Sequence, residues 1–124
     1  MSAEYHLSAD SARRFANDWI EAWNLHDLDR IMAHYAESVV LTSPIAAVLL
    51  NNRDGTVRGR QALRAYFQKG LEAYPQLRLE LIEVMWGLNS IVLYYQNHKG
   101  TKSGEFMEFD SQGKVARVVA NYSG

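Results

Sequence analysis

The 124-residue sequence contains no cysteine and only two prolines, and its charges nearly cancel. Without cysteine the chain forms neither disulfides nor a thiolate nucleophile, which fits a reducing cytoplasm. A formal net charge of -1 gives no electrostatic reason to expect a nucleic acid or an anionic membrane as a partner. The longest apolar run, Ile45 to Leu50, is far too short to span a bilayer.

Motifs for cofactors and metals are also missing. The sequence has no glycine-rich nucleotide-binding loop and no nucleophile elbow of the α/β-hydrolase type. Its four histidines, at positions 6, 26, 34 and 98, do not have the spacing of metal ligands. We therefore expect neither a metal site nor a cofactor.

The length and the composition, with 48% hydrophobic residues, predict one globular domain over residues 1–124. The chain is organised around residues 19–44, which predict the end of one helix, a polar break, a short helix and a strand. Phe15, Trp19 and Trp23 recur at helical spacing, and Ser8 is a suitable N-cap, so a helix is predicted over 9–23. Asp27 is placed to cap the second helix.

The rest of the chain predicts one more helix and then strands. Residues 59–74 have an apolar helical face, and Pro75 prevents the helix from continuing. The apolar pattern then alternates, with a shift of phase that indicates a bulge near Leu81. Four strands joined by short turns follow the helices, which predicts an α+β fold with three helices packed on a curved, mostly antiparallel sheet. For Ile45 to Leu50, a strand, a lid and an association surface all remain open.

Three segments carry a family resemblance: WxxxWNxHDLDxIxxHYAExVxxxSP over 19–44, VRGRxALRxYF over 57–67 and FDSQGKVARVVANY over 109–122. Together they resemble the nuclear transport factor 2-like superfamily, and within it the SnoaL-like polyketide cyclases and the steroid Δ-isomerases. The resemblance implies a cone-shaped fold that encloses an apolar pocket. Because this fold carries isomerases, cyclases, hydrolases and non-enzymatic binding domains, it does not by itself assign a reaction.

The resemblance also implies three catalytic positions. The tyrosine donor of the steroid isomerases falls on Trp19, their aspartate base on Ser43, and their protonated aspartic acid on Glu105. An indole N–H donates as a phenol does, but a serine hydroxyl is no base without an activator. A steroid isomerase of the usual kind is therefore not expected, and a base from elsewhere requires His34 or Glu37 to turn inward.

Glu105 is the strongest single candidate. It shares one strand face with Met107 and Phe109, so its carboxyl is expected in an apolar pocket with a raised pKa, suited to a neutral donor or general acid. The alternative is a solvated strand end beside Gly104. The ligand-binding residues implied by the pattern are Trp23, Tyr35, Tyr66, Phe67, Met107, Phe109, Val118, Ala120 and Tyr122.

These observations leave three functional hypotheses. The first is a cofactor-independent isomerase, cyclase or hydratase that acts by acid–base chemistry on a small apolar oxygenated molecule. The second is a non-catalytic binding module for such a molecule, and the third is a protein-interaction domain. Because Val119 places an apolar side chain on the face opposite Val118, a homodimer through the sheet is also expected.

Overall fold

The computed structural model describes residues 5–124, and within them the chain folds into one six-stranded sheet with helices on one side. The elements, in chain order, are α1 Ala9–Asn24, α2 Leu28–Met32, β1 Tyr35–Thr42, α3 Pro44–Leu49, β2 Thr56–Arg58, α4 Arg60–Ala73, β3 Leu79–Trp86, β4 Ser90–Asn97, β5 Lys102–Phe109 and β6 Val115–Tyr122. The α+β class and the late run of four strands are as predicted. The described chain has one helix more than the three expected, namely α3.

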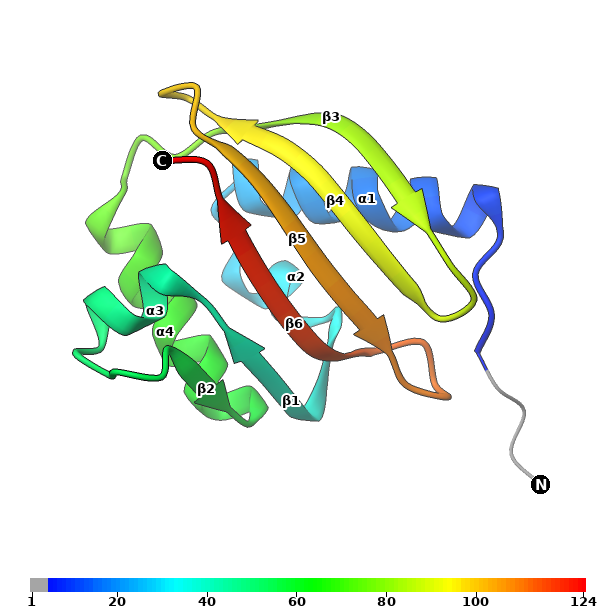
Figure 1. Cartoon of the computed structure of the whole chain (residues 1–124), viewed down its shortest axis with the longest axis horizontal. Helices are drawn as coiled ribbons and strands as arrows, with labels where there is room; N and C mark the ends of the chain where they lie inside the picture. The colour runs from blue at the N-terminus through cyan, green and yellow to red at the C-terminus, as the bar shows by residue number, and fades with distance from the viewer. Residues whose placement is uncertain (1–4) are drawn as a thin grey trace.

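The sheet is curved, and its two faces differ. The strand order is β2-β1-β6-β5-β4-β3, and every neighbouring pair is antiparallel except β1 with β6. Figure 1 shows α1 and α2 behind the sheet, while no helix of the described chain crosses the front of β3 to β6. α1 packs against β3, and α4 packs against β1. One face is therefore buried under helices and the other is left uncovered.

α1 begins and ends close to where the sequence predicts. Ser8 is its N-cap, and Ser8 and Ser11 form a reciprocal capping box in which each side chain binds the other residue's backbone N–H. One stripe of the helix is buried, from Ala12 through Trp19 to Trp23. The stripe fixes the face that α1 turns toward the sheet.

The polar break after α1 fastens the helix to β3. The Asn24 side chain makes two hydrogen bonds with the backbone of Leu79, donating to its carbonyl (2.9 Å) and accepting from its N–H (2.7 Å). His26 Nε2 lies 2.9 Å from the carbonyl oxygen of Leu77. β3 is an edge strand of the sheet, so no further strand binds the outward N–H and C=O of Leu79 in the described chain. The Asn24 side chain supplies their hydrogen-bond partners. These contacts also hold Leu77 and Leu79 in place.

The structure around Pro44 decides one of the three alternatives that the sequence leaves open for Ile45 to Leu50. Residues Pro44–Leu49 form α3, with Ser43 as N-cap and proline in its first turn. The strand alternative is therefore wrong. β2 was not predicted, because it is only three residues long and its pairing with β1 is a tertiary contact.

The late strands follow the predicted pattern. The register of β3 with β4 shifts between Leu81 and Glu83, which confirms the bulge near Leu81. On β6, Val118 and Ala120 are buried on the helix side, whereas Arg117 and Asn121 are exposed on the other side. The alternation therefore places Tyr122 and Ala120 on the covered face of the sheet.

Candidate functional site

A cavity of about 130 Å³ lies between the covered face of the sheet and helices α1, α3 and α4. Aromatic and aliphatic side chains form most of its wall. The residues that line it are Trp19, Trp23, Leu41, Ser43, Ile45, Tyr66, Phe67, Gly70, Tyr74, Leu77, Leu79, Tyr95, Asn97, Ser103, Glu105, Ala120 and Tyr122. Glu105 is the one carboxylic acid among them.

Glu105 is held inside this cavity by β5. Its side chain is only 6% exposed, so it is not a solvated strand end. The hydroxyl of Tyr95 on β4 donates a hydrogen bond of 2.7 Å to Glu105 Oε1. Burial raises the pKa of Glu105 to about 7, and the hydrogen bond from Tyr95 opposes this rise only in part. Both the protonated and the ionised carboxyl are therefore populated near neutral pH.

Four tyrosines surround the acid. Burial raises the pKa of Tyr95 and of Tyr122 well above the usual value, and the nearby Glu105 adds to both rises. The pKa of Tyr66 is raised to about 12, again chiefly by burial. Burial also raises the pKa of Tyr35, with Glu105 as the second cause. These phenols hold their protons at neutral pH, so they do not compete with Glu105 for protons.

Ser43 has a structural role at the cavity wall. Its side chain is almost fully buried, and its Oγ accepts a hydrogen bond of 3.1 Å from the backbone N–H of Ile45, as an N-cap does. Hydrogen bonding with Ser43 also lowers the pKa of Tyr66 and of Tyr122, against the larger effect of burial. Ser43 thus orients α3 and two phenols, and among residues 5–124 no base is in hydrogen-bonding contact with it.

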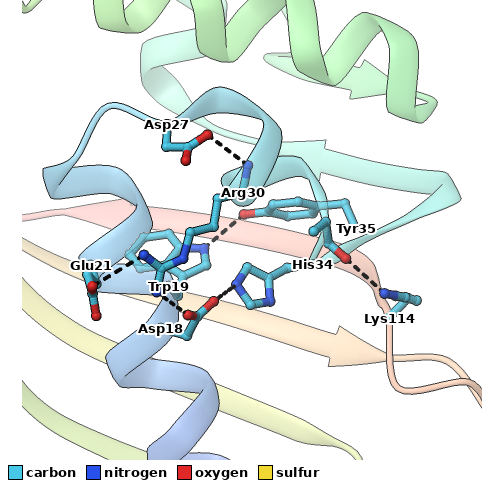
Figure 2. Close-up of polar contacts among 9 residues, drawn as sticks. Asp18, Trp19, Glu21, Asp27, Arg30, His34, Tyr35 and Lys114 are labelled. Carbon is cyan, nitrogen blue, oxygen red and sulfur yellow. Dashed lines mark hydrogen bonds and ion pairs between the residues drawn. The ribbon is translucent and has the colours of Figure 1, made fainter.

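Trp19 does not offer its N–H to the cavity. Figure 2 shows the indole of Trp19 turned toward Tyr35, and its Nε1–H donates a hydrogen bond of 3.0 Å to the Tyr35 hydroxyl. Because an indole has a single donor, none remains for a ligand. The donor role assigned to Trp19 from the sequence is therefore corrected: Trp19 contributes wall area, and its donor is used within the core.

The two alternative bases lie outside the cavity. His34 Nε2 is 2.7 Å from Asp18 Oδ2, and Arg30 also binds Asp18 (Figure 2). Burial lowers the pKa of His34, although Asp18 opposes this. Glu37 is exposed on β1. Neither residue lines the cavity, so among residues 5–124 Glu105 is the one candidate for its proton-transfer base.

Trp23 takes a different position from Trp19. It lines the cavity, is 9% exposed and packs edge-on against Phe67 with ring centroids 4.8 Å apart. Its Nε1 is buried and makes no hydrogen bond within residues 5–124. Buried N–H groups without an acceptor are rare in folded proteins. The ring of Trp23 therefore contributes to the cavity wall, while its N–H lies in the packed core without an acceptor among the described residues.

The remaining predicted ligand-binding residues divide into two groups. Tyr66, Phe67, Ala120 and Tyr122 line the cavity together with Trp23. Tyr35, Met107, Phe109 and Val118 are buried but lie outside its wall. Strand alternation places the last three on the correct face, but it does not say how far along the sheet the cavity extends. Phe109 instead packs against Phe15, with ring centroids 5.0 Å apart.

The sequence prediction missed several polar residues of the wall, of which Tyr95 matters most. Leu93 pairs directly with Glu105, and Tyr95 pairs with Ser103, so Tyr95 is a diagonal neighbour of Glu105 on the same face. The sequence predicts strands over 91–97 and 105–109 and the turn between them, but not the register of the pair, and it is the register that places Tyr95 beside Glu105. Asn97 was missed for the same reason.

Metal-ligand clusters and membrane-spanning helices are both absent from the described residues. No three histidine, aspartate or glutamate side chains among residues 5–124 come together as metal ligands. None of the helices in that range is long and apolar enough to cross a membrane.

Comparison with known proteins gives a family and a fold. The profile of the SnoaL-like domain matches residues 16–120. The crystal structure of a SnoaL-like protein of unknown function from Burkholderia thailandensis E264 is 32% identical, with a TM-score of 0.91 over 96% of this chain and 99% of that one. No curated protein sequence matches the chain significantly.

More distant structures share the fold alone. The epoxide hydrolase/cyclase-like enzyme SalBIII, described for its role in pyran ring formation in the polyether salinomycin, is 15% identical, with a TM-score of 0.71 over 92% of each chain. An NTF2-like protein of unknown function from Cytophaga hutchinsonii is 12% identical, with a TM-score of 0.68 over 90% of this chain and 89% of that one.

Proposed function

The chain belongs to the SnoaL-like domain family, and we propose that it is a cofactor-independent isomerase, cyclase or hydratase that acts by acid–base chemistry on a small, apolar, oxygenated molecule. The observation that carries the proposal is the position of Glu105, a buried carboxyl with a pKa raised to about 7 in the wall of an aromatic cavity. A general acid–base works best when its pKa lies near the working pH.

Glu105 alone supplies both halves of the proton transfer in this proposal. The ionised carboxylate takes a proton from a carbon or a water, and the resulting acid returns it to another atom of the same substrate. The Tyr95 hydroxyl, 2.7 Å from Oε1, fixes the orientation of the carboxyl. The neutral hydroxyls of Tyr66 and Tyr122 line the same cavity and donate to oxygen atoms on which charge develops.

The nature of the wall supports a small neutral substrate. A charged ligand would lose its hydration in a cavity whose wall carries one carboxyl and no lysine or arginine. Ser43 stands where steroid isomerases have their aspartate base, so turnover of a steroid of the usual isomerase type is not expected. The absence of cysteine fits a cytoplasmic location, which we include in the proposal.

Deuterium exchange tests the proposal without knowledge of the natural substrate. Proton removal next to a carbonyl is an elementary step shared by isomerisation and cyclisation, so the wild-type protein is expected to catalyse exchange of α-protons of small ketones in D₂O. The rate, followed by NMR, should depend on the ionised form of a group with a pKa of about 7. Glu105→Gln should reduce it to the rate in buffer.

The same measurement distinguishes a binding module from an enzyme. If ketones bind in the cavity but exchange no faster than in buffer, the non-catalytic alternative is correct. Exchange that persists in Glu105→Gln would remove Glu105 from the mechanism. Glu108→Gln is the matched control, because Glu108 is on the same strand but faces away from the cavity.

The uncovered face of the sheet supports a homodimer as part of the proposal. A row of cross-strand neighbours runs over this face from Met85 to Val92, Phe106 and Val119. Met85 is 51% exposed, and the other three are partly exposed. A second copy of the chain, related by a two-fold axis, would lay the same apolar row against this one. The interaction-domain alternative would use the same face for a different protein.

Val119→Lys is expected to weaken the homodimer by roughly a factor of ten or more, because it places a charge in the dry centre of the interface. Sedimentation equilibrium should give twice the chain mass of 14.1 kDa for the wild type and a concentration-dependent monomer for the variant. Gln112→Lys makes the same change of charge at an exposed turn and should leave the dimer intact. A wild-type protein that sediments as a monomer at micromolar concentration would contradict the dimer.

A further inference from the structure

The two carboxyl oxygens of Glu105 have different surroundings. Oε1 accepts the hydrogen bond of 2.7 Å from the Tyr95 hydroxyl, and within residues 5–124 no other side chain hydrogen-bonds the acid. Oε2 has no partner in that range, yet it is not enclosed. Among those residues, the one solvent-inaccessible side-chain nitrogen or oxygen without a partner is Trp23 Nε1. Because Glu105 lines the cavity, Oε2 is the oxygen that opens to it.

Ser103 determines the direction of the hydrogen bond from Tyr95. The two residues pair across β4 and β5, so their side chains are neighbours on the covered face, and Ser103 is only 4% exposed. Burial raises the pKa of Tyr95, whereas hydrogen bonding with Ser103 lowers it. A hydrogen bond that favours a phenolate is one donated to the phenol oxygen, so Ser103 is the donor. The single proton of the Tyr95 hydroxyl is then left for Glu105 Oε1.

We propose that Tyr95 and Ser103 are positioning residues that confine proton transfer to Oε2 of Glu105, an inference that rests on the proposed function. With Tyr95 donating to Oε1, the proton of the neutral acid resides on Oε2. The ionised carboxylate takes a proton from a substrate carbon at Oε2, and the electron pair of the broken C–H bond stays on the substrate as an enolate. The new Oε2–H bond breaks when the proton returns to another substrate atom. Tyr95 keeps its own proton throughout.

No second charge in the cavity wall distinguishes the two oxygens. The titratable groups that line the cavity or interact with the acid are Tyr35 of β1, Tyr66 of α4, Tyr74 after α4, Tyr95 of β4 and Tyr122 of β6. Helices α1 and α3 and strand β3 contribute no titratable group to the wall, and it contains no lysine, arginine or histidine among the described residues. The direction of the Tyr95 hydrogen bond therefore decides which oxygen carries the proton.

Tyr95→Phe keeps the ring and removes the donor to Oε1. Because the lost hydrogen bond favours the carboxylate, the midpoint of the Glu105 titration should rise by about one pH unit, measured by ¹³C NMR of the carboxyl. Catalysed deuterium exchange at pH 7 should then fall about fivefold and recover at higher pH, since the carboxylate becomes less populated but is not lost. Tyr94→Phe is the matched control, because Tyr94 is on the same strand and faces the other side of the sheet.

A pair of substitutions at Ser103 tests its role. Ser103→Ala removes the donor to Tyr95 and leaves the phenol oxygen free to accept the proton of the acid, so the Glu105 midpoint should rise here too, by less than in Tyr95→Phe. Ser103→Thr keeps a hydroxyl and should restore the wild-type midpoint. A role in packing alone would lower stability without moving the midpoint, and threonine would not differ from alanine in the titration.

Infrared spectroscopy identifies the oxygen that carries the proton. The carbonyl band of the neutral acid is isolated at about pH 5 by subtracting the spectrum of the same protein with Glu105→Gln. A carbonyl that accepts a hydrogen bond stretches at a lower frequency than a free one. With the proton on Oε2, the carbonyl oxygen is Oε1, so Tyr95→Phe should move the band to a higher frequency. With the proton on Oε1, the band would stay in place.

Each outcome decides the matter. A higher midpoint together with a higher carbonyl frequency in Tyr95→Phe supports the proposal. An unmoved band overturns it, and catalysed exchange that still depends on Glu105 would then leave the proposed function intact. A band that moves in a protein without catalysed exchange supports the assignment of the two oxygens and removes the enzyme. If Tyr95→Phe does not fold, the titrations of Ser103→Ala and Ser103→Thr decide, and equal midpoints in wild type and both variants overturn the proposal.

Discussion

Glu105→Gln is expected to become more stable relative to the wild type as the pH rises from about 4.5 to above 7. Glutamine keeps the shape of the side chain and accepts a hydrogen bond from Tyr95, but it does not titrate. In the wild type, burial raises the pKa of Glu105 from 4.5 to about 7. The difference in free energy of unfolding between the two proteins should therefore change with pH across this interval and be constant outside it.

The sign follows from the direction of the shift. The folded protein binds the Glu105 proton more tightly than the unfolded chain does, so protonation favours folding. This contribution is fully present below the unfolded pKa of about 4.5 and is lost as the pH rises through the folded pKa of about 7. Since one pKa unit corresponds to about 1.4 kcal/mol, the wild type should lose roughly 3 kcal/mol relative to the variant.

Urea denaturation of both proteins at several pH values measures this difference. Asp18 and His34 also have shifted pKa values, but they contribute equally to both proteins and cancel. Glu108→Gln, on the opposite face of β5, should not reproduce the change. Parallel curves for wild type and Glu105→Gln would show that Glu105 titrates as a solvated residue, and the proposed acid–base chemistry would lose its only group.

The fold could be predicted largely because its signals are local. The cap at Ser8, the cap at Asp27, the stop at Pro75 and the phase shift near Leu81 each depend on a few neighbouring residues, and each is found in the structure. α3 was left open because Ile45 to Leu50 is uniformly apolar and has no periodicity that separates helix from strand. β2 depends on pairing with β1, which no local pattern shows.

The candidate site was less predictable, because it depends on where side chains meet. The alternation of β5 placed Glu105 on the covered face, and the structure has it in the cavity wall. The donors of Trp19 and Trp23 have the same chemistry and the same helical stripe, yet Trp19 meets Tyr35 and Trp23 meets no acceptor among the described residues. The partner of Trp19 lies on another element, because Tyr35 is on β1 and sixteen residues further along the chain. No local pattern in the sequence shows such a contact.

A second large effect is expected at Gly55, which lies against the N-cap of α3. Gly55 has φ +62°, and its carbonyl accepts a hydrogen bond of 2.9 Å from the Ser43 backbone N–H. A Cβ at this position would lie 2.5 Å from the Ser43 carbonyl oxygen, closer than nonbonded atoms approach. Gly55→Ala therefore combines a backbone strain of about 1 kcal/mol or more with a backbone clash of about 1–3 kcal/mol.

Gly100→Ala distinguishes the cost of the backbone strain from the cost of the clash. Gly100 has φ +84° in the β4–β5 turn, and a Cβ there would meet no atom within 4 Å, so this variant carries the strain without the clash. Urea denaturation should show a loss of about 3 kcal/mol for Gly55→Ala and about 1 kcal/mol for Gly100→Ala. Because Ser43 orients α3 beside Tyr66 and Tyr122, Gly55→Ala should also weaken the binding of small ketones in the cavity, whereas Gly100→Ala should not. Equal losses of stability would mean that the chain relaxes around Gly55 and that its close approach to Ser43 does not shape the cavity.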